Sequence, residues 1–249
     1  MSAEQRPIRV GVAGLGYWGP NLARNLDAIP GCELRWLCDP AAPARAKLAR
    51  AYPGARVTGE PEELMADPEL DAVVLATPVP THAALAIRAL EAGKHCLVEK
   101  PLATSSADAE AAVAAAARAG KLLMVGHLLE YHPAVVRLKE LIDDQELGPL
   151  YYVYGNRLNL GQLRADENAL WSLGAHDVSV VLHLIGEEPQ ECLAQGASYV
   201  RPGFRTSCSA TCASPRGSSP TCTCPGLTRT RSAVSRLSAR AGWRPSTTC

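Results

Sequence analysis

The feature that most constrains the fold of this chain is an alternation of short apolar runs with longer helical segments up to residue 127. The runs "IRVGVA", "CELRWLC", "DAVVLAT", "HCLVE" and "LLMVG" are as short and apolar as buried strands, and stretches with helical periodicity separate them. Strands that alternate with helices of about 10–15 residues favour βαβ units, because parallel strands need a crossover connection. The sequence therefore predicts an α/β domain over residues 1–127, built on a doubly wound parallel sheet.

A second domain of different character is predicted over residues 128–203. The segment "YHPAVVRLKELIDDQEL" has the pattern of an amphipathic helix, and "LYYVYGNRLNL" that of a long strand. A further helix, "ALWSLGAHDVSVVLHLIG", and a strand within "QECLAQGASYV" follow. We expect an α+β domain that is incomplete at residue 203.

Composition excludes several classes of protein. The formal net charge is zero and no run of about 20 apolar residues occurs, so neither a nucleic-acid partner nor a membrane is expected. The opening residues, "MSAEQR", contain no apolar leader. The cysteines at 32, 38, 96 and 192 are widely separated, which is typical of a reducing compartment. We therefore expect a cytoplasmic protein without a metal site.

The segment "GLGYWG" at residues 14–19 fits the pattern G-x-G-x-x-G. It follows a predicted strand, begins a predicted helix, and precedes Asp39, which lies at the end of the second strand. Glycines let the backbone approach a pyrophosphate, the helix amino terminus favours its charge, and Asp39 can accept from ribose hydroxyls. A purely structural turn is the alternative. A carboxylate at position 39 would repel a 2′-phosphate, so NAD is favoured over NADP. The cofactor-binding residues predicted here are Gly14, Gly16, Tyr17, Trp18, Gly19 and Asp39.

The segment "ATPVPTHAALAIRALEAGKHCLVEKPLA", taken with the glycine-rich turn, resembles the Gfo/Idh/MocA oxidoreductases, the glucose–fructose oxidoreductase and inositol dehydrogenase family. The resemblance extends from about residue 7 to residue 202. It implies an NAD(P)-binding Rossmann domain followed by a domain with a large, open, mainly antiparallel sheet. It also implies oxidation or reduction of a hydroxyl or ketone on a sugar, cyclitol or nucleotide-sugar.

The resemblance assigns roles to residues of this segment. Thr77 and Pro78 would lie along the nicotinamide side of the cofactor, with His82 nearby. "EKP" at residues 99–101 matches a family signature whose lysine reaches the substrate oxygen, although lysines are most often solvated surface residues. The further cofactor-binding residues implied are Thr77, Pro78, His82, Glu99 and Lys100.

The helix "LGAHDVSVVLHLIG" resembles the family's D-x-G-x-H-x-x-D helix, and His176 falls on its histidine. In this chain, Ser172 and Ser179 occupy the two aspartate positions. The family contains a subgroup that tolerates such replacements and acts on nucleotide-linked N-acetylated sugars or their uronates. Hydride loss from a sugar hydroxyl must be coupled to loss of its proton, which an imidazole can accept while an ammonium stabilises the oxygen. We expect Lys100 and His176 to be catalytic, although a histidine within a core is the alternative for His176. The predicted substrate contacts are Tyr131, Asn156, Arg157, Asn159, Trp171 and Asp177.

The segment 204–249 differs from the rest of the chain. All 25 acidic residues precede it, and "TSCSATCASPRGSSPTCTCPG" is rich in Ser, Thr, Pro and Cys. The cysteine spacing does not match a zinc ribbon, and a disulfide knot conflicts with a reducing compartment. A disordered basic tail and an out-of-frame translation remain as interpretations. If the reading frame of the gene is moved back by one base, "TSCSATCAS" can become "DVVFGNLRL" and "SSPTCTCPGLTRT" can become "VVAHVHVSWLDPH". In both translated segments, apolar and polar residues alternate as they do in strands.

The leading hypothesis is an NAD-dependent dehydrogenase acting on a small sugar, cyclitol or nucleotide-sugar. An NAD-dependent glycosidase and a cofactor-binding protein without turnover are the alternatives. If the chain ends as written, its second sheet lacks strands, and the family's sheet-mediated homo-oligomers are not expected.

Overall fold

The computed structural model describes residues 6–158, 168, 170–198, 207–213, 221–224 and 234–241. The chain divides into two compact units, unit 1 (Met1–Gly126) and unit 2 (His127–Cys249). The division falls one residue before the domain boundary predicted from the sequence.

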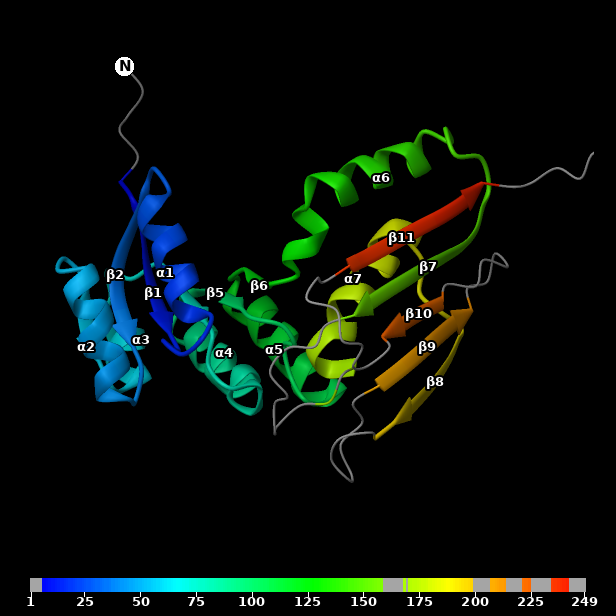
Figure 1. Cartoon of the computed structure of the whole chain (residues 1–249). Helices are drawn as coiled ribbons and strands as arrows, with labels where there is room; N and C mark the ends of the chain where they lie inside the picture. Colours follow the sequence, from blue (N-terminus) through cyan, green and yellow to red (C-terminus); the bar gives the residue numbers. More distant parts are fainter. Residues whose placement is uncertain are drawn as a thin grey trace, which may run out of the picture. The chain divides into compact units, whose positions relative to one another are not determined.

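Unit 1 contains a six-stranded parallel sheet with the strand order β3-β2-β1-β4-β5-β6, as the sequence predicts for a doubly wound domain (Figure 1). The chain leaves β1 first toward one edge and then, from β4, toward the other edge. Ligands of such sheets bind where the order reverses, outside the carboxyl ends of the strands. The strands are β1 (Ile8–Ala13), β2 (Cys32–Cys38), β3 (Arg56–Thr58), β4 (Ala72–Leu75), β5 (His95–Val98) and β6 (Leu123–Val125).

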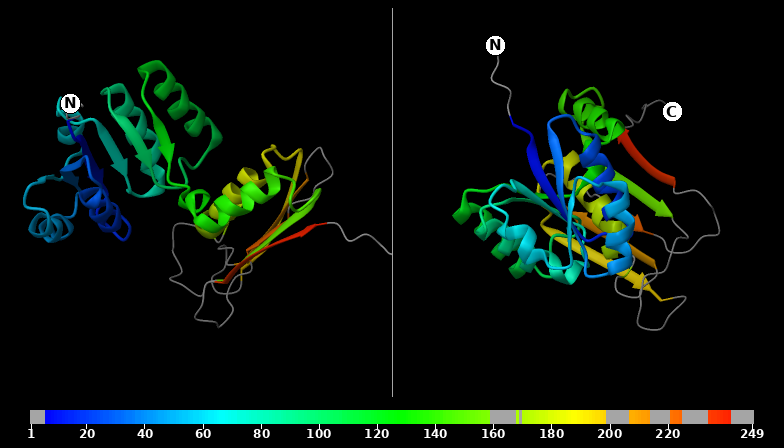
Figure 2. Two further views of the ribbon diagram at one scale, coloured as in Figure 1. Left: turned by 90° about the horizontal axis from the view of Figure 1, so that it is seen from above. Right: turned by 90° about the vertical axis from the view of Figure 1, so that its left-hand side faces the viewer.

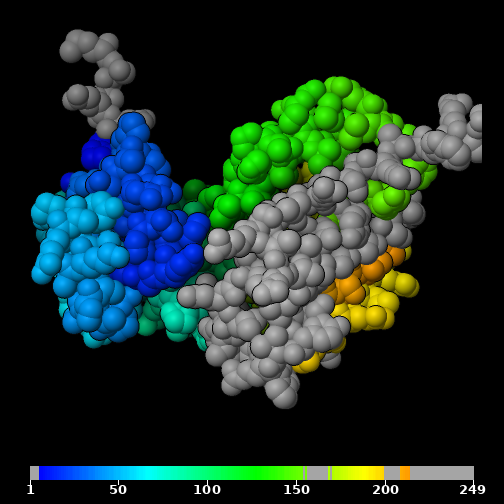
Figure 3. All heavy atoms as spheres, viewed as in Figure 1, coloured from blue at the N-terminus to red at the C-terminus, as the bar shows by residue number. Residues whose placement is uncertain are grey.

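Helices pack on the two faces of this sheet and form two separate cores (Figure 2). Ala23 of α1 and Leu48 of α2 belong to one core. Leu64 of α3, Leu90 of α4 and Ala115 of α5 belong to the other. In the space-filling view, the blue and cyan atoms of this unit pack closely (Figure 3). The helices are α1 (Gly19–Ala28), α2 (Ala42–Ala51), α3 (Pro61–Ala66), the 3-10 turn η1 (Val79–Thr81), α4 (His82–Glu91) and α5 (Ser106–Ala119).

The ends of these helices follow from local chemistry. The hydroxyl of Ser105 accepts from the backbone N–H of Asp108 at 3.1 Å and so caps α5. Gly120 ends α5 in the left-handed region with a φ of 60°, where glycine carries no steric penalty. None of the described helices combines the length and the hydropathy that crossing a membrane would require.

Unit 2 contains a five-stranded sheet with the order β11-β7-β10-β9-β8 among the described residues. Its pairs are antiparallel except for β10 with β7, so the sheet is mainly antiparallel, as the resemblance implied. The helices α6 and α7 lie on one face of this sheet (Figure 2). The elements are η2 (Leu128–Tyr131), α6 (Pro133–Asp143), β7 (Leu150–Leu158), the π-helical segment η3 (Leu170–Gly174), α7 (Ala175–Ile185), β8 (Glu191–Ala197), β9 (Ser207–Ala213), β10 (Thr221–Cys224) and β11 (Val234–Ala241).

Three of these strands lie in the segment 204–249, for which a disordered basic tail and an out-of-frame translation are the two interpretations of the sequence. β9 pairs with β8 from Ala197↔Ser207 to Glu191↔Ala213, and Cys208 packs against Leu170. Because the sheet is held by backbone hydrogen bonds, short Ser, Thr and Cys side chains do not prevent pairing. β9 and β10 fall within the two stretches that alternate as strands in the other reading frame, and the out-of-frame interpretation stays a prediction.

Candidate cofactor and active site

The glycine-rich turn between β1 and α1 is fixed by close packing at two glycines and is open at the third. Gly14 has a φ of 94°, and a Cβ there would lie 2.5 Å from the backbone nitrogen of Thr77. A Cβ on Gly19 would overlap the carbonyl oxygen of Gly14. At Gly16, no atom of the described residues other than Gly16 and its two chain neighbours lies within 4 Å of the position that a Cβ would occupy. The turn therefore offers an open backbone surface at the amino terminus of α1, as an anionic group requires.

Asp39 lies at the carboxyl end of β2 and is tied to this turn. Its Oδ2 accepts from the backbone N–H of Leu15 at 2.7 Å, and its Oδ1 accepts from Ala41 at 2.8 Å. Arg45 of α2 donates from Nη1 to the carbonyl oxygens of Asp39 at 2.6 Å and Pro40 at 2.8 Å. Sequence reasoning missed Arg45, and an arginine in the first turn of the helix that follows the acidic residue was the available signal.

Thr77 and Pro78 follow β4 at the same edge of the sheet. The hydroxyl of Thr81 lies 2.8 Å from that of Thr77 and 2.7 Å from the carbonyl oxygen of Pro78, which fixes this turn. His82 begins α4 and is buried, with 1% of its surface exposed. Its Nε2 lies 2.7 Å from the carbonyl oxygen of Thr77, and its Nδ1 lies 2.8 Å from that of Pro101. Both ring nitrogens therefore face backbone carbonyl groups, and the cofactor contact expected for His82 stays a prediction.

Glu99, Lys100 and Pro101 follow β5 at this edge, and the Lys100–Pro101 peptide bond is cis. Burial raises the pKa of the Glu99 carboxyl, although hydrogen bonds from Lys100 and the Trp18 side chain and the charges of Lys100 and His82 act in the opposite direction. A Cβ on Gly126, the residue after β6, would lie 3.2 Å from Oε1 of Glu99. Sequence reasoning missed Gly126, and a glycine directly after a buried strand was the signal.

Unit 1 therefore gathers a set of predicted residues on the ends of three neighbouring strands, β1, β4 and β5. Tyr17, with 82% of its surface exposed, and the half-exposed Trp18 complete the turn. The set consists of Gly14, Gly16, Gly19, Thr77, Pro78, Glu99 and Lys100.

Apart from Lys100, the residues predicted to act on the substrate belong to unit 2. His176 and Asp177 are in the first turn of α7; Asp177 is buried, and Ser179 donates to the carbonyl oxygen of His176 at 3.0 Å. Trp171 is exposed on η3, where Oδ1 of Asn168 accepts from its backbone N–H at 3.1 Å. Tyr131 is exposed on η2. Asn156 and Arg157 lie on β7, and only their backbone is described; Asn159 lies outside the described residues.

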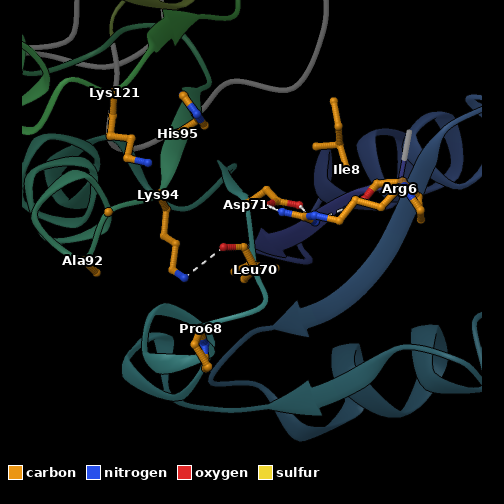
Figure 4. A pocket seen from close by; sticks show the side chains of 11 residues that line it. Arg6, Ile8, Pro68, Leu70, Asp71, Ala92, Lys94, His95 and Lys121 are labelled. Atoms are coloured by element: carbon orange, nitrogen blue, oxygen red, sulfur yellow. Dashed lines mark hydrogen bonds and ion pairs between the residues drawn. The ribbon is translucent and has the colours of Figure 1, made fainter. Parts of the chain in front are cut away.

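A cavity of about 740 Å³ opens at the opposite, amino-terminal edge of the sheet in unit 1 (Figure 4). Lys94 is buried beside it and donates from Nζ to the carbonyl oxygens of Asp67 at 2.5 Å and Leu70 at 2.9 Å. Arg6 forms two hydrogen bonds with the Asp71 carboxylate, at 2.6 and 2.7 Å. These hydrogen bonds engage the residues that directly precede β4. Because ligands of doubly wound sheets bind at the carboxyl edge, this cavity is not the candidate cofactor site.

Comparison with known proteins agrees with this geometry. Residues 8–127 match the model of the Gfo/Idh/MocA family, described as an oxidoreductase family with an NAD-binding Rossmann fold. Inositol 2-dehydrogenase 2 of Saccharopolyspora erythraea is 32% identical over 205 residues, which are 80% of this chain and 60% of that protein. UDP-N-acetylglucosamine 3-dehydrogenase of Acidithiobacillus ferrooxidans is 33% identical over 199 residues, 78% of this chain and 59% of that protein. The chain thus spans less than two thirds of the length of these relatives.

The chain also resembles solved structures. GenD2 from gentamicin A biosynthesis, solved in complex with NAD, superimposes with a TM-score of 0.88 and is 28% identical. The superposition covers 97% of this chain and 72% of GenD2. The turn at Gly14, the acidic residue that ends β2 and the family-model match place residues 8–127 of this chain in the Gfo/Idh/MocA family of oxidoreductases.

Proposed function

We propose that the chain is an NAD-dependent oxidoreductase that transfers hydride between nicotinamide and a hydroxyl or keto carbon of a sugar, cyclitol or nucleotide-sugar. The observation that carries the proposal is the open backbone at Gly16, next to Asp39, at the carboxyl edge of the sheet. This arrangement suits a dinucleotide, whose pyrophosphate needs a close approach to backbone N–H groups and whose ribose needs an acceptor. NAD, when bound, supplies the site that accepts or releases the hydride.

The choice of NAD over NADP rests on Asp39. Both of its carboxylate oxygens accept from backbone N–H groups, which holds the negative charge at the end of β2. The negative charge of this carboxylate would repel the 2′-phosphate of NADP if that phosphate were bound here. Arg45 lies beside Asp39, but its Nη1 donates to two backbone carbonyl oxygens. The carboxylate therefore decides the preference, and the arginine holds the loop that carries it.

Lys100 and His176 carry the proposed chemistry at the reacting oxygen. A sugar hydroxyl does not ionise near neutral pH, so hydride departure requires a base that removes the hydroxyl proton. His176 accepts this proton, and the ammonium group of Lys100 stabilises the negative charge that develops on the oxygen. The substrate contacts proposed from the family resemblance are Tyr131, Asn156, Arg157, Asn159, Trp171 and Asp177.

The substrate class is drawn from the relatives. Relatives at 32% and 33% identity are named for an inositol and for UDP-N-acetylglucosamine. Both substrates contain a six-membered ring with several hydroxyl groups, and a lysine and a histidine at one hydroxyl would serve either of them. We therefore propose a small cyclitol or nucleotide-sugar as the partner of the site.

The test combines binding with turnover on the full chain. Fluorescence titration with NADH measures cofactor affinity, and NADH formation is then followed with NAD and a panel of inositols, sugars and UDP-sugars. Lys100→Met is expected to keep NADH affinity near that of the parent and to lose turnover, whereas Lys121→Met, at the amino edge of β6, keeps both. Full turnover by Lys100→Met contradicts the assignment. Cleavage of a glycoside without net NADH would show the glycosidase alternative, and binding without turnover on any substrate would leave a cofactor-binding protein.

A further inference from the structure

His82 is enclosed by acceptors that a neutral imidazole cannot satisfy. The ring is almost fully buried, and each nitrogen lies within hydrogen-bond distance of a backbone carbonyl oxygen, Nε2 at 2.7 Å from Thr77 and Nδ1 at 2.8 Å from Pro101. A carbonyl oxygen can only accept, and a neutral imidazole has one N–H donor and one acceptor nitrogen. In either neutral tautomer, one nitrogen lone pair would therefore face a carbonyl lone pair without water between them.

Turning the ring over does not remove the conflict. A flipped ring would place Cδ2 and Cε1 where the two nitrogens now lie. C–H groups approach carbonyl oxygens at about 3.3–3.6 Å, so contacts of 2.7 and 2.8 Å are too short for carbon. The distances therefore suit N–H donors on both sides of the ring.

The charges around the ring agree with a cation. Glu99 is the acidic group whose carboxyl interacts with the charge of His82, and that interaction favours the ionised carboxylate. Two carbonyl dipoles also point their negative ends at the ring. The amino terminus of α4, where His82 lies, acts against the cation, but the helix dipole is weaker than two charge-assisted hydrogen bonds at these distances.

The two carbonyl groups belong to the two turns that carry the proposed nicotinamide end of the site. Thr77 follows β4, and Pro101 directly follows Lys100 after β5. We propose that His82 is a buried imidazolium that donates to Thr77 and Pro101 and so holds these two turns in register. His82 is then a positioning residue: it touches neither substrate nor cofactor and fixes the backbone on which Thr77 and Lys100 are carried. Its effect on binding rests on the proposed function, whereas its protonation does not.

Protonation is tested directly by nuclear magnetic resonance on the full chain with isotope-labelled histidine. The signals of His82 are assigned by their loss in His82→Gln. At neutral pH, we expect two slowly exchanging ring N–H protons and two protonated ring nitrogens. A single N–H proton with one unprotonated nitrogen would overturn the proposal, whether or not the chain binds a nucleotide.

Positioning is tested by comparing two ligands, NADH and ADP-ribose, the second of which lacks the nicotinamide. Gln can keep one of the two donated bonds, so His82→Gln is expected to weaken NADH binding about ten-fold and to leave ADP-ribose binding unchanged. His82→Leu, which keeps neither bond, is expected to weaken NADH binding further. His95→Gln is the matched control, because His95 lies at the amino edge of β5 and accepts from Leu122 there; both affinities should be unchanged.

The outcomes separate the two proposals. Equal loss of both ligands in His82→Gln would indicate a general loss of the fold and would overturn the positioning role, as would unchanged NADH affinity. If the parent chain binds neither ligand but shows two ring N–H protons, the imidazolium stands and the proposed function fails. Thermal unfolding of each variant shows whether the measured protein is folded.

Discussion

The backbone N–H of Leu15 donates to Oδ2 of Asp39 at 2.7 Å, so the carboxylate that ends β2 is fastened to the glycine-rich turn that follows β1. The other carboxylate oxygen, Oδ1, accepts a hydrogen bond from the backbone N–H of Ala41 at the start of α2. One side chain therefore orders the two loops on which the proposed adenosine half of the cofactor depends. Loss of Asp39 should change both the shape and the charge of this part of the site.

Asp39→Ala is expected to weaken NADH binding about ten-fold or more, because a charged hydrogen-bond acceptor and the support of the turn are both removed. The preference for NADH over NADPH should fall as well, because the repulsive charge is gone. Paired fluorescence titrations with the two nucleotides measure both effects. Asp27→Ala, on the exposed side of α1, serves as the control; an unchanged preference in Asp39→Ala would contradict the role given to the carboxylate.

Gly14 and Gly16 should respond differently to the same substitution. Gly14→Ala combines a φ of 94° with a Cβ 2.5 Å from the Thr77 nitrogen, so it should lower the free energy of unfolding. The loss should exceed the about 1–2 kcal/mol that a left-handed conformation alone costs. Gly31→Ala is the control for that conformational cost, since Gly31 has a φ of 81° and no described atom near its Cβ position.

Gly16→Ala, in contrast, is expected to unfold like the parent chain but to bind NADH more weakly. The position has open space among the described residues, so the methyl group meets the ligand instead of the protein. Chemical denaturation and NADH titration on the same preparation separate the two quantities. A destabilised Gly16→Ala with normal NADH affinity would contradict the open surface at this turn.

Glu99 should make the folded state less stable as the pH rises. Burial raises its pKa above the model-peptide value of 4.5, so between that value and the higher folded pKa the folded chain binds more protons than the unfolded one. Stability from this group is therefore present below about pH 4.5 and declines above it. Glu99→Gln should flatten that decline in denaturation curves recorded across this range. Glu110→Gln, on the exposed surface of α5, should leave the decline as in the parent.

Asp71 should have the opposite effect. The Arg6 guanidinium and the backbone N–H of Arg9 lower the pKa of Asp71 to about 2. The stabilisation is present above the unfolded pKa of 3.8 and is lost as the pH falls toward 2. Asp71→Asn should cost roughly 0.5–1 kcal/mol at neutral pH, as exposed ion pairs do, and the difference from the parent should vanish below pH 2. A constant difference across this range would contradict the ion pair.

The cysteines should differ strongly in reactivity. Burial raises the pKa of Cys38 to about 11 and that of Cys96 to about 12, so both should resist alkylation in the folded state. Cys192 is exposed, and its Sγ lies 2.9 Å from that of Cys212 across the β8–β9 pair. Oxidised glutathione should link these two, with release of two glutathione thiols. Peptide mapping by mass spectrometry measures the link, and the same peptides show directly whether residues 207–213 are translated as "SCSATCA".

Much of unit 1 could be predicted because its signals are local. Gly14 and Asp39 are recognised by their places at the ends of apolar runs, and Gly120 ends α5 as a helix stop. β3 and α3 were not predicted, since three and six residues are too short for a periodic pattern. The surroundings of His82 depend on Pro101, which only the tertiary structure brings near. The strands after residue 204 were missed because backbone pairing leaves no pattern in Ser, Thr and Cys.

The contact between Gly126 and Glu99 limits how this family member can vary. A Cβ at 126 would lie 3.2 Å from Oε1 of Glu99, so a larger residue at 126 requires the buried carboxylate to move or to be replaced. The two positions follow neighbouring strands, β5 and β6, so a side chain introduced at 126 alone would have to be accommodated by a shift of the Glu99 carboxylate. In sequence design, residues 99 and 126 should therefore be varied together.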